Sequence, residues 1–106
     1  MKNYLFVCSM GWSRSPAAES AARKIAYEKK KKILTEHLGL YSGAKISEDR
    51  ISTFDKIFVM DKEMMRILRE EYHYKKPIIN LSVKDIYDMD DSGLSRIMEN
   101  KLRKHI

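Results

Sequence analysis

The segment from Cys8 to Ser15 holds the residues whose types and spacing could do chemistry. It contains one thiol, five intervening residues, the guanidinium of Arg14 and the hydroxyl of Ser15. A loop of this length can fold so that its backbone N–H groups point inward, and a helix N-terminus at its end adds further positive character. Arg14 can bind two phosphate oxygens at once through its planar fork of donors. The spacing therefore predicts an anion-binding loop.

Cys8 is the candidate nucleophile of this loop. The positive field favours the thiolate, which is the reactive form of cysteine, and Ser15 can donate a hydrogen bond to it. A thiolate that faces a bound phosphoryl group is placed to attack phosphorus. Cys8 taken alone is more typical of a small buried apolar residue at a strand end. The whole arrangement, with an Arg-Ser-Pro sequence and an alanine-rich stretch after the loop, favours the catalytic interpretation.

The residues between the nucleophile and the helix are expected to bind the substrate. Gly11 can adopt a positive φ, which a loop folded back on itself usually requires. Trp12 either forms a wall of the substrate site or covers the neighbouring helix. The full set of expected substrate-binding residues in this segment is Ser9, Met10, Gly11, Trp12, Ser13 and Ser15.

Strands that alternate with helices are expected to position this loop. Short β-prone runs predict strands at 4–8, 39–44, 56–60 and 77–81. Apolar residues at helical spacing predict helices at 15–31, 62–72 and 94–106, the first with Ser15 as N-cap and Pro16 at the first helical position. The stretch 82–92 is polar and irregular. This alternation indicates a parallel sheet covered on both faces, which binds ligands at the carboxyl ends of its strands.

Length and composition limit the classes of protein. The chain has 106 residues, 43% of them hydrophobic and 34% charged, which indicates one globular domain spanning 1–106. The net charge of +6 favours anionic partners. A single cysteine excludes an internal disulfide and a four-cysteine metal site, and together with the absence of an export signal it predicts a cytoplasmic protein. No stretch is apolar enough to span a membrane, and the three histidines have no metal-ligand spacing, so we expect neither membrane nor metal binding.

The sequence resembles the low-molecular-weight protein tyrosine phosphatases, especially their short members. The specific match is Phe6-Val7-Cys8 followed by Arg14-Ser15-Pro16-Ala17-Ala18-Glu19, which is similar to the family signature. Weaker matches are Gly43 in a turn and Asp55 to Asp61 at the third strand. The resemblance implies hydrolysis of phosphotyrosine through a phosphocysteine intermediate without any cofactor. It implies a phosphorylated protein or small aryl phosphate as partner and inorganic phosphate as product.

The resemblance also implies a catalytic acid on a late loop. Asp85 with Tyr87 two residues later matches the aspartate and first aromatic of the family's Asp-Pro-Tyr motif, although Ile86 replaces the proline. Tyr87 is then a further substrate-binding residue. Asp88 and Asp90 are rival acids, and all of these carboxylates could instead cap the terminal helix. The anion loop departs from the family pattern too, because Met10-Gly11 replaces Gly-Asn and Ser13 stands where many members have a second cysteine.

We therefore predict an α/β three-layer sandwich whose four-stranded parallel sheet has the order 2-1-3-4, with helices on both faces. Two other functions stay open: arsenate reduction with an external thiol, and non-catalytic binding of phosphate or phosphopeptides. The lysine run 29–32 is either a solvated helix end or a docking patch for an acidic partner. Nucleic acid is an unexpected partner, because no aromatic residues are interleaved with the basic ones.

Overall fold

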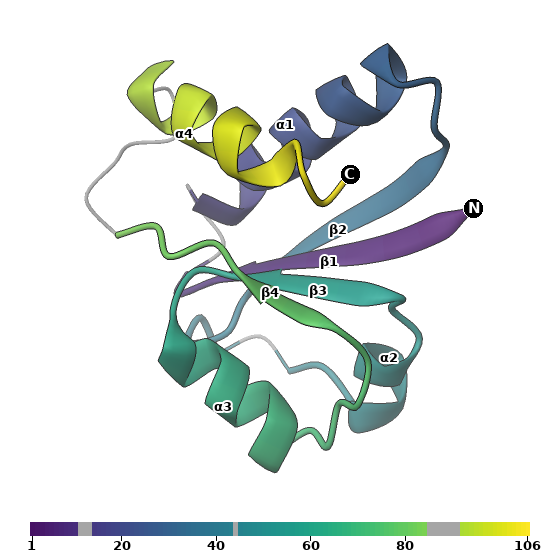
Figure 1. Cartoon of the computed structure of the whole chain (residues 1–106). Helices are drawn as coiled ribbons and strands as arrows, with labels where there is room; N and C mark the ends of the chain where they lie inside the picture. The colour runs from purple at the N-terminus through teal and green to yellow at the C-terminus, as the bar shows by residue number, and fades with distance from the viewer. Residues whose placement is uncertain (11–13, 44, 85–91) are drawn as a thin grey trace.

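The computed structural model describes residues 1–10, 14–43, 45–84 and 92–106. Its elements follow one another as β1 (Lys2–Cys8), α1 (Arg14–Glu28), β2 (Ile33–Gly39), α2 (Glu48–Ser52), β3 (Lys56–Val59), α3 (Lys62–Glu70), β4 (Ile78–Asn80) and α4 (Ser92–Leu102). The strands form one parallel sheet in the order β2-β1-β3-β4, which confirms the predicted topology. Helices α1 and α4 lie on one face of this sheet and α2 and α3 on the other (Figure 1).

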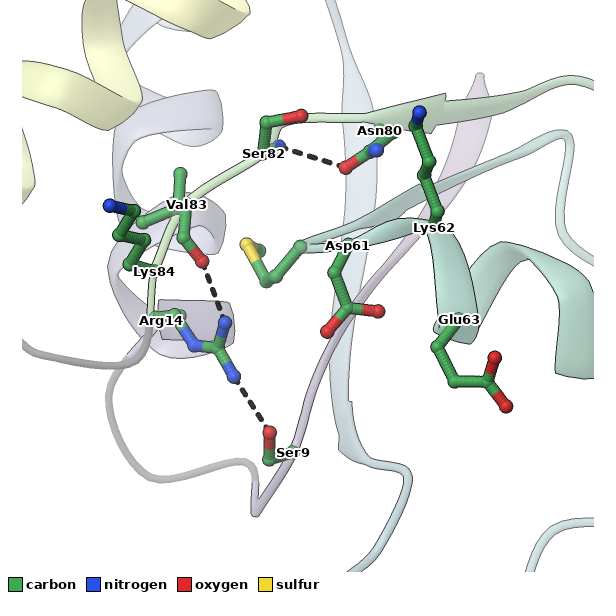
Figure 2. A pocket seen from close by; sticks show the side chains of 10 residues that line it. Ser9, Arg14, Asp61, Lys62, Glu63, Asn80, Ser82, Val83 and Lys84 are labelled. Atoms are coloured by element: carbon green, nitrogen blue, oxygen red, sulfur yellow. Dashed lines mark hydrogen bonds between the residues drawn. The ribbon is translucent and has the colours of Figure 1, made fainter.

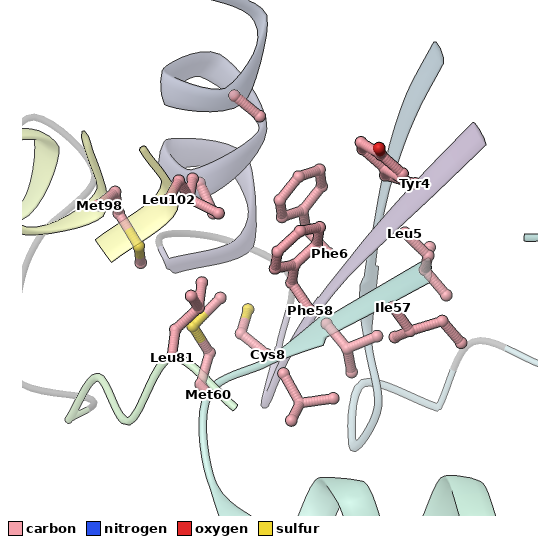
Figure 3. Packing of buried hydrophobic residues seen from close by; sticks show 14 of the residues in the cluster. Tyr4, Leu5, Phe6, Cys8, Ile57, Phe58, Met60, Leu81, Met98 and Leu102 are labelled. Carbon is pink, nitrogen blue, oxygen red and sulfur yellow. The ribbon is translucent and has the colours of Figure 1, made fainter. Parts of the chain in front are cut away.

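The centre of the sheet forms as the sequence predicts. β1 is hydrogen-bonded to a strand on each side and covered on both faces, so five consecutive residues from Tyr4 to Cys8 are buried. On β3, Phe58 stacks on Phe6 with ring centroids 4.9 Å apart and an interplanar angle of 7°. Figure 3 shows this pair within the apolar cluster, with Cys8 beside it. The core thus anchors the strand that ends at the candidate nucleophile.

The predicted second strand is wrong in position. The sequence predicts a strand at 39–44, whereas β2 covers Ile33–Gly39 and pairs in register with β1 from Lys2 opposite Ile33 to Cys8 opposite Gly39. β2 is an edge strand, and Leu34, Glu36 and His37 are exposed. Charged and polar residues are typical of such edges and hide the apolar alternation. In the part of 39–44 that the structure describes, the chain turns, with Gly43 at φ 87°.

One helix is missing from the prediction. α2 is five residues long and buries a single apolar residue, Ile51, so it carries no detectable periodicity. Ser47 caps it by accepting a hydrogen bond from the N–H of Arg50 at 3.0 Å. The other helices are confirmed with shifted ends, since α1 stops at Glu28 and α4 covers Ser92–Leu102.

The lysine run that follows α1 binds the C-terminal segment of the chain, directly after α4. Lys29 donates to the carbonyl of Arg103 at 2.7 Å, and Lys31 donates to the carbonyl oxygen of Ile106 at 2.5 Å. Lys24 and Glu99 form an ion pair at 2.9 Å between the same two helices. Part of the run therefore has a structural role that neither interpretation of the sequence anticipated. None of the helices in the described ranges is long and apolar enough to cross a membrane.

Candidate active site

A cavity of about 670 Å³ opens at the carboxyl ends of β1, β3 and β4 (Figure 2). The parallel sheet brings together segments that are far apart in the sequence at this edge, as expected for such folds. The cavity is lined by Ser9, Arg14, Met60, Asp61, Lys62, Glu63, Asn80, Ser82, Val83 and Lys84. Three of these residues are cationic and two are anionic, so the lining carries a net positive charge.

Cys8 ends β1 and Ser15 lies in the first turn of α1, and the two side chains meet. The Sγ of Cys8 is 3.1 Å from the Oγ of Ser15, and both residues are buried. α1 begins at Arg14, so Ser15 lies inside the helix and is not its N-cap as predicted. Pro16 falls in the first turn, where no backbone N–H is needed. The expected contact between thiol and hydroxyl therefore forms, although the helix starts one residue earlier.

Arg14 is buried, with 3% of its surface exposed, and joins two segments of the site. Its Nη2 donates to the Oγ of Ser9 at 2.7 Å, and its Nη1 donates to the carbonyl of Val83 at 2.6 Å (Figure 2). A buried guanidinium is costly unless hydrogen bonds compensate its lost hydration, and these two charge-assisted bonds do so. The guanidinium is thereby held at the cavity wall, at the first turn of a helix whose dipole also favours an anion there.

The segment after β4 is shaped to present the Val83 carbonyl. The N–H of Leu81 donates to the carbonyl of Val59 at 2.8 Å and that of Val83 to the carbonyl of Met60 at 3.1 Å, so pairing with the β3 side continues beyond β4. Between them, Ser82 has a φ of 52°, a left-handed conformation that costs a non-glycine residue about 1 kcal/mol or more. The Oδ1 of Asn80 stabilises this turn by accepting from the N–H of Ser82 at 2.8 Å.

Two further residues at this edge are not among the predicted site residues. Asp61 lines the cavity and also caps α3, accepting from the N–H of Met64 at 2.9 Å. Tyr41, which is 48% exposed, donates its N–H to the carbonyl of Ser9 at 2.7 Å. Partial burial and the carboxylates of Asp61 and Glu63 raise the pKa of Tyr41. Tyr41 directly follows the carboxyl end of β2, so a correct prediction of that strand would have indicated that Tyr41 lies near the site.

The structure brings together part of the predicted site. Ser9 and Arg14 line the cavity, and Met10 is an exposed neighbour of Ser9. Cys8 is only 2% exposed and lies one residue before the first lining residue, so the thiol is not part of the cavity wall formed by the described residues.

The remaining predicted site residues lie outside the described residues. These are Gly11, Trp12, Ser13, Asp85 and Tyr87, together with the rival acids Asp88 and Asp90. Lys84, the last described residue before Asp85, lines the cavity. Among the described residues no group of histidine, cysteine and carboxylate side chains could hold a metal ion.

Comparison with known proteins identifies solved structures that have the same fold. No protein-family model and no curated protein matches the sequence. Solved structures do match over nearly the whole chain. YwlE from Bacillus subtilis, in a mutant form, has a TM-score of 0.77 at 17% identity, covering 99% of this chain and 96% of its own.

Two further solved structures are low-molecular-weight protein tyrosine phosphatases. The one from T. tengcongensis has a TM-score of 0.76 at 17% identity, covering 100% of both chains. SP-PTP from Streptococcus pyogenes has a TM-score of 0.72 at 18% identity, covering 99% of this chain and 91% of its own. The chain therefore has the fold of low-molecular-weight protein tyrosine phosphatases, which confirms the resemblance at the level of the fold.

Proposed function

We propose that this protein hydrolyses phosphomonoesters through a phosphocysteine intermediate formed on Cys8, with phosphotyrosine in proteins as the substrate. The observation that carries the proposal is the contact of Cys8 with Ser15 at the junction of β1 and α1, beside the buried guanidinium of Arg14. A hydroxyl 3.1 Å from the sulfur can donate to a thiolate, and the adjoining guanidinium can neutralise a phosphoryl group.

The first step transfers the phosphoryl group to sulfur. The Cys8 thiolate attacks phosphorus in line, a P–S bond forms, and the P–O bond to the leaving group breaks. Arg14 and the backbone N–H groups of residues 9–14 stabilise the charge on the equatorial oxygens. Asp85 protonates the departing oxygen, so the leaving group departs as a neutral alcohol or phenol. Lys84, the last described residue before this acid, lines the cavity, which supports an acid from the segment that follows it.

The second step regenerates the enzyme. The same carboxylate accepts a proton from water, whose oxygen attacks phosphorus, and the P–S bond breaks to release inorganic phosphate and the thiolate. A solved structure with the same fold supports this chemistry: it is described as the YwlE arginine phosphatase, in a cysteine-to-serine mutant with a phosphorylated active-site serine. That description also makes phosphoarginine a substrate to be tested beside phosphotyrosine.

The decisive experiment measures hydrolysis of p-nitrophenyl phosphate, a phosphotyrosine peptide and a phosphoarginine peptide by the wild type and by Cys8→Ser. We expect the wild type to hydrolyse the first two, and the Cys8→Ser variant to lose turnover while still binding phosphate in calorimetry. Phosphate should also protect Cys8 of the wild type from alkylation by iodoacetate. Turnover by Cys8→Ser near the wild-type rate would exclude the covalent mechanism, and phosphate binding without any turnover by the wild type would favour a binding module.

The acid is tested by its dependence on the leaving group. Asp85→Asn should lower kcat on phosphotyrosine by about 10²–10⁴-fold, the range typical of general acid catalysis. The loss should be much smaller on p-nitrophenyl phosphate, whose leaving group needs little protonation. Asp88→Asn and Asp90→Asn are matched controls. If Asp88→Asn shows this dependence on the leaving group and Asp85→Asn does not, Asp88 is the general acid.

A further inference from the structure

A second, smaller cavity lies next to the first, between the end of β4 and the last turns of α4. Its volume is about 320 Å³, and it shares Asn80 and Ser82 with the candidate active site. The two cavities therefore adjoin each other at the turn that follows β4. We call the second cavity the basic pocket and define it by its polar lining residues Asn80, Ser82, Asn100, Lys101, Lys104 and His105.

The charges of the basic pocket all have one sign. Lys101 lies in the last turn of α4, and Lys104 and His105 lie in the turn that follows the helix; all three line the pocket. No acidic residue lines the pocket in the described part of the chain, and neither lysine forms a salt bridge there. Arg103, which directly follows α4, differs, since it pairs with Glu28 at the end of α1 at 3.1 Å. The positive charge of the basic pocket is thus left without a protein counter-charge among the described residues.

The polar groups of the basic pocket are suited to bind an anion. The Oδ1 of Asn80 accepts from the N–H of Ser82, so the NH2 group of Asn80 remains as a hydrogen-bond donor. Asn100 and Ser82 supply further neutral donors. Burial and the charges of Lys104 and Lys56 lower the pKa of His105, which is consistent with a positive potential at this site.

We propose that the basic pocket binds an acidic side chain of the phosphorylated polypeptide whose phosphoryl group occupies the neighbouring active site. This proposal rests on the proposed function and specifies its substrate class: phosphorylated segments with glutamate or aspartate a few residues away. The size of the pocket suits a single side chain, and neighbouring residues of an extended peptide are about 3.3 Å apart along the chain. Opposite charge then selects the sequence of the substrate.

The test compares peptides that differ only in charge. Each phosphotyrosine peptide carries a single glutamate, placed at one of the three positions before or the three positions after the phosphorylated residue. The matched peptide carries glutamine at the same position. The variant is Lys101→Gln combined with Lys104→Gln. The control is Lys32→Gln combined with Lys75→Gln, which removes the same charge at two exposed lysines near the amino ends of β2 and β4. Lys104→Gln alone, at an exposed position, serves if the double variant does not fold.

The wild type should prefer glutamate over glutamine at one or two positions by about tenfold in kcat/KM, as expected for charge pairs made by one half-buried and one exposed lysine. The Lys101/Lys104 variant should lose this preference while its rate on p-nitrophenyl phosphate stays within about twofold of the wild type. The control variant should keep the preference, and added salt should weaken it. A wild type without preference at any position, or a preference that survives in the Lys101/Lys104 variant, would overturn the proposal.

Failure of the proposed function gives a different result. In that case neither p-nitrophenyl phosphate nor any peptide is hydrolysed, and the same peptides are compared by fluorescence anisotropy on the wild-type protein. Tighter binding of glutamate peptides that disappears in the Lys101/Lys104 variant would still support the basic pocket. Equal affinity for glutamate and glutamine peptides would overturn it.

Discussion

Replacing Arg14 by lysine separates the geometry of this side chain from its charge. Arg14 makes two hydrogen bonds in opposite directions, to Ser9 and to Val83, from a side chain that is 3% exposed. A lysine ammonium is a point donor on a flexible stem and cannot reproduce the planar fork, so it can keep one of these bonds at best. Loss of one bond from a charged donor costs about 1.5–3 kcal/mol of the free energy of unfolding.

The two consequences for Arg14→Lys can be measured independently. Chemical denaturation should show the loss of about 1.5–3 kcal/mol, and kcat on p-nitrophenyl phosphate should fall by about 10²–10³-fold, as is typical when one preorganised donor to the transition state is lost. Phosphate should raise the melting temperature of the wild type more than that of the variant, because at a given concentration a ligand that binds more tightly stabilises the native state more. Arg23→Lys, on an exposed position of the same helix, is the matched control and should change neither quantity. An Arg14→Lys variant within about twofold of wild-type kcat and about 0.5 kcal/mol of wild-type stability would refute the reasoning.

Three other changes test the site and its support. Ser15→Ala removes the hydroxyl 3.1 Å from the Cys8 sulfur and should slow both turnover and alkylation of Cys8 by roughly 10–100-fold at neutral pH, measured with p-nitrophenyl phosphate and iodoacetamide. Asn80→Ala removes the acceptor that holds the left-handed turn after β4 and should lower kcat with a loss of only about 1 kcal/mol in denaturation. Tyr74→Phe removes a buried hydrogen bond of 2.8 Å to the carbonyl of Phe54 and should cost about 1–3 kcal/mol. Burial raises the pKa of Tyr74 to about 12, so the native state keeps a proton that the unfolded chain loses above pH 10. The free energy of unfolding of the wild type should therefore fall between pH 10 and 12. It should fall less in Tyr74→Phe.

The central part of the fold could be predicted because its elements are buried in a regular pattern that the sequence shows directly. β1 is buried on both faces and reads as a continuous apolar run, and the alanines of α1 lie at helical spacing on its buried side. A loop between such a strand and such a helix has a defined start and end, which is why Cys8 and Ser15 were expected to meet. The sheet order followed from the same alternation together with the family resemblance.

The edges of the fold could not be predicted from local patterns. β2 has a polar, exposed side because only one neighbour covers it, so its residues resemble a loop, and the prediction placed the strand six residues too late. α2 is held by one buried isoleucine and a serine cap, both too local for a periodic signal. Tyr41 is not predicted beside Ser9 because the predicted strand at 39–44 includes it. In the structure Tyr41 follows the end of β2 and hydrogen-bonds to Ser9.

The candidate site depends on a contact that no motif contains. Arg14 and Val83 are separated by 69 residues, and the carbonyl that accepts from Arg14 belongs to the backbone, so its role has no trace in the residue types. The carbonyl is presented because the N–H of Val83 pairs with Met60 and because Asn80 stabilises the turn between β4 and Val83. Residues of the same turn line both the candidate active site and the basic pocket. β4 has only three residues, yet the turn that follows it contributes to three features. It presents the carbonyl that holds Arg14, it leads into the segment with the proposed acid, and it lines the pocket proposed to select acidic substrates.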